Sequence, residues 1–233
     1  MTTFIKGDIH EEIKLLPTDS VDFIYTSPPF AITEAKWDKP LKWDILFGEM
    51  WRVLKPNGVI VLYASCPFTY ELLKYETPKY HYSWTKSNST GFFKAKLQPL
   101  RNIEEIFVYY KKQPTYNPQM EGTKFTPKRY NKMKDKQQHF GVRSNIEKSY
   151  TSKNEGHTGK YPTTSRNWKV RRDGSGITRG DDQMEYFMKT YSNEGDTILD
   201  MTCCNDYTGK VAAKLNRKFI GIDINLPEEL ITQ

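Results

Sequence analysis

The stretch Val21-Asp22-Phe23-Ile24-Tyr25-Thr26-Ser27-Pro28-Pro29-Phe30 joins an apolar run to a Pro-Pro step. Residues 21–25 are mostly β-branched or aromatic, which is typical of a strand buried on both faces of a parallel sheet. Proline cannot continue a central strand, so the Pro-Pro step marks its carboxyl end. Ligands of open α/β sheets bind at that edge, and we expect the functional site there.

The residues of the Pro-Pro step suit the transfer of a group to an exocyclic amine of a nucleobase. Such an amine is a poor nucleophile because its lone pair is delocalised into the ring, so a catalyst must draw its N–H bonds toward acceptors. Ser27 offers a hydroxyl and Pro28 a carbonyl without a ladder partner, while Phe30 offers a flat face for the base. From these residues alone, a proline-terminated strand with Phe30 in the core is an equal alternative.

Strands and helices alternate along most of the chain, which indicates an α/β fold. Further strands are expected at 4–6, 59–63, 80–84, 105–110, 197–199 and 218–222, and helices at 11–16, 42–54, 68–76, 182–191 and 208–216. Residues 55–58 are expected to form a turn because they read Lys-Pro-Asn-Gly. The length of 233 residues favours one domain with a sizeable insertion.

Positive charge is concentrated between residues 111 and 179. This segment has 17 Lys and Arg against 5 Asp and Glu, a net charge of +12, whereas the whole chain has +7. Tyr, Phe and Trp residues lie among the cations, a mixture that suits phosphate contact and base stacking. The alternative is a flexible, solvated basic loop without a partner.

Residues 197–223 form a predicted strand-loop-helix-strand unit, with Asp200 ending its first strand and Asp223 its second. An acid after the second strand is the layout that binds an adenosine ribose. Asp8, after the first strand of the chain, is either a ligand-facing carboxylate or a turn acid.

The three cysteines, two of them adjacent, indicate neither a disulfide framework nor a zinc site, so no metal is expected. The first six residues lack an apolar signal core, and no run approaches the roughly 18 residues of a membrane span. We therefore expect a cytoplasmic protein with no membrane partner.

In order and content, these motifs resemble the amino-directed DNA methyltransferases that use S-adenosylmethionine, in their beta arrangement. The resemblance covers most of the chain and rests on Gly7-Asp8, residues 16–22, Ser27-Pro28-Pro29-Phe30, residues 52–58, Tyr161-Pro162-Thr163, Asp200 and residues 219–223. Enzymes with a related N-P-P-Y motif that act on protein glutamine or ribosomal RNA usually have the opposite order and an Asn at the position of Ser27.

The resemblance implies a Rossmann-like, mostly parallel sheet of seven strands with helices on both faces. Residues 111–179 would be a target-recognition insertion between a catalytic half, 1–110, and a cofactor-binding half, 180–233. Duplex DNA would be the partner, with the target base flipped onto Phe30, and a homodimer is a family expectation. The DNA-contacting candidates are Lys128, Arg129, Arg143, Arg166, Arg171 and Arg172, chosen chiefly because Arg pairs bidentately with guanine.

The resemblance also assigns the site residues. Asp223 would hold the ribose hydroxyls of S-adenosylmethionine, Asp8 would approach its adenine or methionine side, and Asp200 would shape the cofactor loop. The other residues expected at the cofactor are Thr26, Thr202, Cys204, Asn205 and Thr208. The expected catalytic residues are Ser27, Pro28, Pro29 and Phe30.

Two signals disagree about the target base. Thr-Ser-Pro-Pro-Phe looks like the cytosine-N4 enzymes, whereas residues 84–92 and 114–119 look like adenine-directed phage enzymes, which have Asp-Pro-Pro-Tyr instead. We favour cytosine N4 slightly, because the first side chain of the motif contacts the amine.

The cofactor loop departs from the family pattern Asp-Pro-Phe-x-Gly-x-Gly-Thr. Cys204 and Asp206 occupy the two glycine positions, where a Cβ raises the steric cost, and Asp206 would repel the cofactor's carboxylate. Residues 175–180 also lack the two prolines of the family's His-Pro-Thr-Gln-Lys-Pro. A DNA-binding pseudo-methyltransferase without cofactor is therefore one alternative, and an RNA-directed methyltransferase is another.

Overall fold

A computed structural model describes residues 1–122, 159–171 and 179–231 of the chain. The chain divides into two compact units, one formed by Met1–Asn117 with Thr163–Gln233 and the other by Pro118–Pro162. In the second unit, the described residues include an antiparallel bridge between Glu121 and Lys160. The limits of the insertion, 111 and 179, stay a prediction.

The first unit contains all the helices and strands that the structure describes. The strands are β1 (Thr2–Lys6), β2 (Val21–Thr26), β3 (Leu54–Ala64), β4 (Tyr80–Thr90), β5 (Arg101–Tyr109), β6 (Ser165–Arg166), β7 (Thr197–Asp200) and β8 (Lys218–Asp223). The helices are α1 (Ile9–Leu15), α2 (Trp43–Val53), α3 (Phe68–Leu72), the 3-10 helix η1 (Phe92–Lys94), α4 (Asp181–Tyr191), α5 (Tyr207–Lys214) and α6 (Glu228–Ile231).

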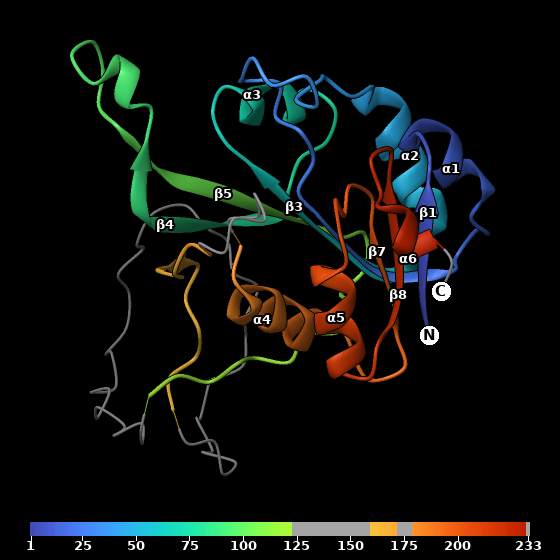
Figure 1. The fold of residues 1–233 in the computed structure, drawn as a ribbon. Coiled ribbons are helices and arrows are strands. Elements are labelled where there is room, and N and C mark those ends of the chain that lie inside the picture. Colours follow the sequence, from blue (N-terminus) through green and yellow to red (C-terminus); the bar gives the residue numbers. More distant parts are fainter. Residues whose placement is uncertain (123–158, 172–178, 232–233) are drawn as a thin grey trace. The chain divides into compact units, whose positions relative to one another are not determined.

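The strands form one mixed sheet in the order β1-β8-β7-β2-β3-β5-β4-β6 (Figure 1). The first five of these are parallel to one another, and β5 is antiparallel to both of its neighbours, β3 and β4. It follows that β4 runs in the same direction as β3. The carboxyl ends of β1, β8, β7, β2, β3 and β4 therefore lie at one edge of the sheet, called the carboxyl edge below.

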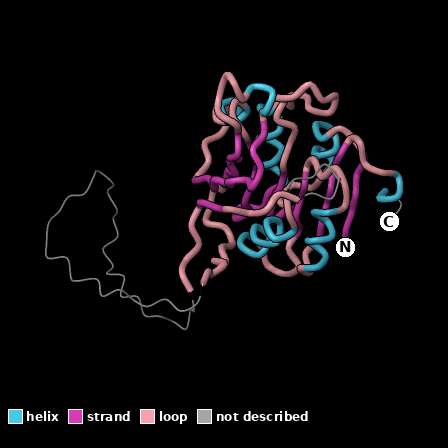
Figure 2. Tube along the Cα trace, turned by 60° about the vertical axis from the view of Figure 1, so that its left-hand side comes forward, coloured by secondary structure: helices cyan, strands magenta, loops and turns pink. Residues whose placement is uncertain are grey.

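Helices cover both faces of the sheet, as predicted (Figures 1 and 2). Side chains of β2 alternate between two apolar clusters, because successive residues of a strand point to opposite faces. Ile24 packs in the cluster that contains residues of α1, α2 and α3. Phe23 and Tyr25 pack in the cluster that contains residues of α4 and α5. A Rossmann-like α/β fold, predicted from the sequence, is confirmed.

Several boundaries differ from the prediction. The turn expected at 55–58 is wrong, since β3 runs from Leu54 through these residues, with a register shift where it pairs with β2 and an ion pair of 2.7 Å between Lys55 and Asp22. The sheet has one strand more than the seven expected, the two-residue β6. Strand β4 continues past residue 84 to Thr90, and β5 begins before residue 105, at Arg101. The two strands pair as an antiparallel hairpin, with a register shift between Thr85 and Thr90.

Across the described ranges, no helix combines the length and apolar character needed to cross a membrane.

Candidate active site at the carboxyl edge

Four predicted site residues lie at the ends of four neighbouring parallel strands. Asp8 follows β1, Asp223 ends β8, Asp200 ends β7 and Thr26 ends β2. The backbone N–H of Gly7 donates to the carbonyl of Asp223 at 3.2 Å, which keeps the first two strands together at this edge. The fold therefore brings residues from both ends of the chain to one row.

The catalytic candidates follow β2 without regular secondary structure. Pro28 is buried, and Ser27, Pro29 and Phe30 are half-buried. In the part of the chain that the structure describes, neither the Ser27 hydroxyl nor the Pro28 carbonyl has a hydrogen-bond partner. Both groups are therefore available as acceptors for an external donor.

Phe30 stacks on Phe68, the first residue of α3, with ring centroids 5.2 Å apart and an angle of 19° between the rings. One face of Phe30 is therefore occupied by protein, and a base can stack only on the other face. Phe30 also packs against both apolar clusters. Its position is therefore intermediate between the two alternatives from the sequence, a ring that stacks on the base and a ring in the core.

Asp38 is a residue that the sequence analysis did not single out. Its side chain, 5% exposed, accepts hydrogen bonds from the backbone N–H groups of Ala31, Ile32 and Thr33 at 2.7, 2.9 and 2.7 Å. Burial acts to raise the pKa of Asp38, but these bonds and one from the Thr33 hydroxyl outweigh it, and the pKa is lowered. Asp38 thus holds the segment that directly follows Phe30, where Ala31 adopts a left-handed conformation with φ of 53°.

The loop after β7 is tied to the end of β2. The hydroxyl oxygens of Thr26 and Thr202 lie 3.1 Å apart. Asp200 accepts hydrogen bonds from the backbone N–H of Thr202 at 3.2 Å and from the hydroxyl of Thr208 at 3.0 Å. Burial raises the pKa of Asp200 to about 6, and these bonds and the positive charge of Arg179 act in the opposite direction. Asp200 therefore holds the loop after β7 in shape, and the binding of a cofactor by this loop stays a prediction.

The substituted glycine positions behave differently from each other. Cys204 has a φ of 63°, the left-handed region that favours glycine, and its N–H donates to the carboxylate of Asp223 at 2.9 Å. Asp206 has a φ of −90°, which any residue adopts, and its carboxylate lies 2.7 Å from the ammonium of Lys210. The strain expected at both positions is therefore present only at Cys204, and the ion pair reduces the negative charge that Asp206 presents.

Two further candidates lie at the starts of helices. Asp8 is the N-cap of α1 and accepts hydrogen bonds from the backbone and the ring of His10, which lower its pKa. This matches the turn-acid alternative, and contact with a cofactor stays a prediction. Asn205 accepts a hydrogen bond at 3.1 Å from the N–H of Tyr207, the first residue of α5.

Arg179 is a second residue that the sequence analysis missed. Its guanidinium lies 4.9 Å from the ring centroid of buried Tyr63, and its charge reaches Asp200 and Cys204. It precedes α4 in sequence and falls at the Lys of the family's His-Pro-Thr-Gln-Lys-Pro, which is the signal that could have found it. The loop after β7 therefore faces a cation.

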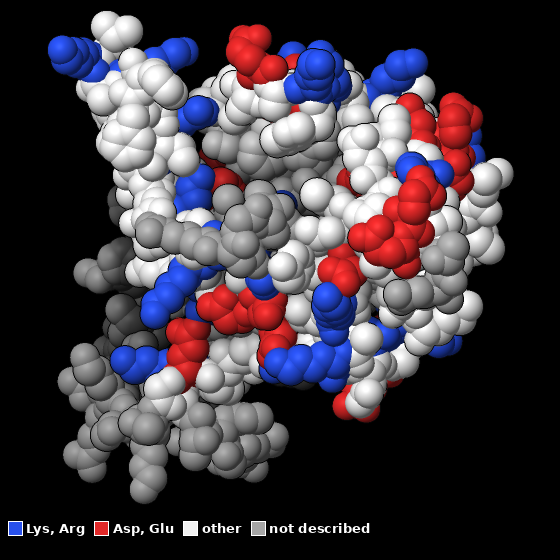
Figure 3. All heavy atoms as spheres, viewed as in Figure 1, with Lys and Arg blue, Asp and Glu red and all other residues white. Residues whose placement is uncertain are grey.

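Of the predicted DNA-contacting residues, Lys128, Arg129, Arg143 and Arg172 lie outside the described residues. Arg166 is 8% exposed, with its guanidinium 4.4 Å from the ring centroid of Tyr186. Arg171 pairs with Asp181 and lies over the ring of Tyr207 at 4.2 Å. Both arginines are engaged within the protein, so their contact with DNA stays a prediction. On the face in Figure 3, basic and acidic side chains of the described residues are interspersed.

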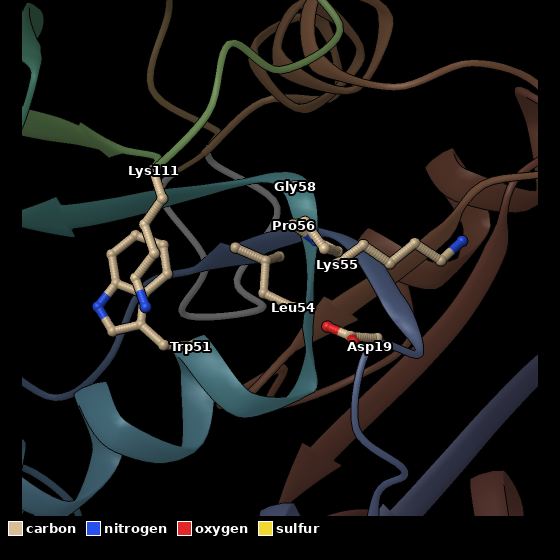
Figure 4. A pocket seen from close by; sticks show the side chains of 7 residues that line it. All are labelled: Asp19, Trp51, Leu54, Lys55, Pro56, Gly58 and Lys111. Carbon is tan, nitrogen blue, oxygen red and sulfur yellow. The ribbon is translucent and has the colours of Figure 1, made fainter.

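A pocket lies at the opposite edge of the sheet (Figure 4). It is lined by Asp19, Trp51, Leu54, Lys55, Pro56, Gly58 and Lys111. The Lys111 ammonium lies 4.8 Å from the ring centroid of Trp51 and covers part of it. Since the lining residues surround the beginning of β3, this pocket is separate from the Pro-Pro step.

Comparison with known proteins shows the family. The model of the N6_N4_Mtase family, described as DNA methylase, matches residues 21–232, so the chain belongs to this family of DNA amino-methyltransferases. The DNA adenine methyltransferase YhdJ of Escherichia coli (strain K12) is 28% identical over 96% of this chain and 78% of its own length.

Two solved structures share the fold. The cytosine-N4-specific PvuII DNA methyltransferase has a TM-score of 0.63 and 16% identity, covering 99% of this chain and 90% of its own. The M1.HpyAVI-SAM complex has a TM-score of 0.57 and 19% identity, covering 100% and 96%. Both cytosine-N4 and adenine enzymes are thus similar to this chain.

Proposed function

We propose that this protein transfers a methyl group from S-adenosylmethionine to the exocyclic amine of a flipped base in duplex DNA, with cytosine N4 slightly favoured over adenine N6. The observation that supports this most is the pair of unoccupied acceptors, the Ser27 hydroxyl and the Pro28 carbonyl, at the end of β2. They lie beside a loop joined to the same strand end through Thr26 and Thr202.

The chemistry of the reaction asks for positioning rather than for a strong base. The amine donates its two N–H bonds to Ser27 and Pro28, which keeps its lone pair out of the ring and available for attack. The base stacks on the face of Phe30 that Phe68 leaves open. Bound S-adenosylmethionine would supply an electrophilic methyl group. The amine nitrogen forms the new N–C bond as the S–CH3 bond breaks, the neutral thioether S-adenosylhomocysteine leaves, and the extra amine proton passes to Ser27 or to water, so no covalent link to the protein is needed. Holding two reactants in line accounts for much of such a rate enhancement.

The residues at the cofactor loop fit S-adenosylmethionine despite the missing glycines. Cys204 keeps the left-handed backbone that glycine would supply, and Asp223, at the end of β8, would accept the ribose hydroxyls. Each oxygen of Asp223 accepts one backbone N–H, from Cys204 or Asn225, and keeps a second lone pair free. Arg179 adds a positive charge that favours the carboxylate of the methionine moiety.

Cytosine N4 is favoured by Ser27 at the first position of the motif. A serine hydroxyl can accept a hydrogen bond from the amine. It adds no charge of its own beside the sulfonium of the cofactor. Cytosine-N4 and adenine enzymes both match the chain, so the proposed preference for cytosine depends on the identity of residue 27 alone.

Binding of S-adenosylmethionine tests the proposal against the pseudo-enzyme alternative. Isothermal titration is expected to give saturable binding at one site per chain, weakened at least about tenfold by Asp223→Ala, since hydrogen bonds to a charged group are lost. The matched control is Glu194→Ala, an exposed acid before β7 at the opposite edge. Duplex DNA binding without any cofactor binding would favour the pseudo-enzyme, and methyl incorporation into RNA in preference to duplex DNA would favour the RNA-directed alternative.

A further inference from the structure

The connection between β4 and β5, residues 91–100, exposes three large apolar side chains. Phe92, Phe93 and Leu97 are 67%, 106% and 85% exposed. Phe93 is as accessible as in an isolated chain, so it contributes nothing to packing within this unit. Apolar side chains clustered on a surface mark interaction sites more often than chance exposure does. We call residues 91–100 the hairpin tip.

The hairpin tip projects beyond the edge that holds the Pro-Pro step. Ala64, the last residue of β3, and Ser83 of β4 both pair with Glu105 of β5, so β3 ends level with Ser83. Strand β4 continues to Thr90, which pairs with Arg101, and a register shift lies between Thr85 and Thr90. Arg101 precedes Glu105 by four residues, so the paired extension is roughly 13 Å at the rise of a strand. Since β4 runs parallel to β3, the extension leaves the sheet at the carboxyl edge (Figure 1).

Charge distinguishes the hairpin tip from an ordinary apolar protrusion. Residues 86–103 contain Lys86, Lys94, Lys96 and Arg101 and no Asp or Glu. Lys86 is paired with Glu104 at 2.8 Å. Lys94 and Lys96 are exposed and form no ion pair with any residue in the described ranges. In Figure 3 the end of the hairpin shows only blue and white atoms.

We propose that the hairpin tip is a DNA-contacting element separate from the basic insertion, with Lys94 and Lys96 on phosphates and the two phenylalanines against bases. The inference rests on the proposed function, in which duplex DNA docks at the carboxyl edge. A duplex held at Ser27 would lie alongside a paired arm that reaches roughly 13 Å past that edge and carries the hairpin tip at its end.

The combination of cations and aromatic rings fits a nucleic acid on both counts. Lysines contact phosphates irrespective of sequence, and apolar side chains inserted at a base step unstack it. Unstacking next to the target lowers the cost of extruding a base.

A second copy of this chain is the competing occupant of the hairpin tip. A symmetric contact between two tips would bring Lys94 and Lys96 of both copies together, and the repulsion favours the polyanion.

The test is an equilibrium titration of a fluorescent duplex, followed by anisotropy at several salt concentrations. The double variant Lys94→Glu/Lys96→Glu is expected to lower the affinity at least about tenfold and to reduce the slope of log affinity against log salt by about 2, since each phosphate contact contributes roughly 0.9. The double variant Phe92→Ala/Phe93→Ala is expected to lower the affinity at least about fivefold with an unchanged slope, as for lost stacking.

Controls are taken from the opposite edge of the sheet. Lys218→Glu at the beginning of β8 and Leu15→Ala at the end of α1 change exposed residues of the same kinds, and should leave the affinity unchanged. If the wild-type chain binds the duplex and both double variants bind it equally well, the inference is wrong and the proposed function stands. If the phenylalanine variant instead converts a dimer to a monomer in light scattering with unchanged DNA affinity, the tip is a self-association surface. A wild-type chain that binds no duplex contradicts the proposed function itself.

Discussion

The hydroxyl oxygens of Thr26 and Thr202 lie 3.1 Å apart, and this contact joins the strand of the Pro-Pro step to the loop after β7. Thr26 is fully buried, and its side chain also hydrogen-bonds Asp200, the last residue of β7. The two residues are 176 positions apart in sequence and belong to the two predicted halves of the site. The contact therefore fixes the end of β2, which carries the predicted catalytic residues, relative to the predicted cofactor loop.

Thr26→Val removes this contact with little change in shape. We expect kcat to fall about tenfold or more, because small displacements of reacting groups are costly, while the free energy of unfolding falls by about 1 kcal/mol. Thr190→Val is the matched control, since Thr190 is equally buried and bonds the Tyr186 carbonyl within α4. Steady-state kinetics would contradict the role of Thr26 if both variants kept the same kcat.

Cys204→Gly should stabilise the protein or leave it unchanged, and should tighten S-adenosylmethionine binding. At a φ of 63° a Cβ costs about 1 kcal/mol, which glycine avoids. Asp206→Gly should instead destabilise the protein, because its φ of −90° needs no glycine and its pair with Lys210 is lost. Urea unfolding and calorimetric titration of both variants check this, and an equal response of the two would refute the distinction.

The buried Asp200 predicts a pH dependence of stability. Burial raises its native pKa to about 6 from an ordinary 3.8, so the native state binds this proton more tightly than the unfolded state. The stability from protonated Asp200 is fully present below pH 3.8 and is lost as the pH rises through about 6. The difference corresponds to about 3 kcal/mol.

Urea unfolding of the wild type and Asp200→Asn between pH 4 and pH 8 measures this effect. Other groups titrate equally in both proteins. Subtracting the free energy of unfolding of the variant from that of the wild type therefore gives the pH-dependent contribution of Asp200. That difference should fall by about 2–3 kcal/mol from the acid to the alkaline end. A difference that is constant with pH would contradict the assigned pKa.

Asp38→Ala should lower both stability and activity. It leaves three backbone N–H groups after Phe30 without their acceptor, at an expected cost of about 2–4 kcal/mol in the free energy of unfolding. Asp38→Asn keeps one acceptor oxygen and should recover part of both losses. Asp44→Ala, an exposed acid in the first turn of α2, is the control. An unchanged kcat in folded Asp38→Ala would show that this segment does not position Phe30.

The sequence predicted the parts of this protein that depend on local pattern. The apolar runs of β2 and β8 and the stripe of Met184, Phe187 and Met188 in α4 were assigned correctly, because burial on a sheet or helix imposes a regular spacing. Because Asp200 and Asp223 each end a predicted parallel strand, the sequence also predicted that they lie at the same edge of the sheet, the carboxyl edge. The turn at 55–58 was wrong because these residues stay within β3 as an irregularity, opposite Asp22 between the pairs Val21–Leu54 and Phe23–Val59. A turn signal from Pro and Gly does not distinguish such an irregularity from a chain reversal.

The residues missed by the sequence act through long-range contacts. Asp38 is one acid in a loop and gains its role only because the chain folds its carboxylate back onto Ala31, Ile32 and Thr33. Arg179 lies far from Tyr63 in sequence and meets it through tertiary packing. The exposure of Phe93 could not be predicted either, since phenylalanine is more often buried than exposed.

The most direct test of the account is methylation of unmodified duplex DNA with S-adenosylmethionine, followed by digestion to nucleosides and mass spectrometry. The account predicts N4-methylcytosine from the wild type, and a rate at least about 100-fold lower from Ser27→Ala with cofactor binding retained, as when one preorganised hydrogen-bond partner is lost. N6-methyladenine would contradict the assignment of the base from Ser27. Absence of any methylated nucleoside, with DNA still bound, would contradict the central claim that this protein is an active methyltransferase.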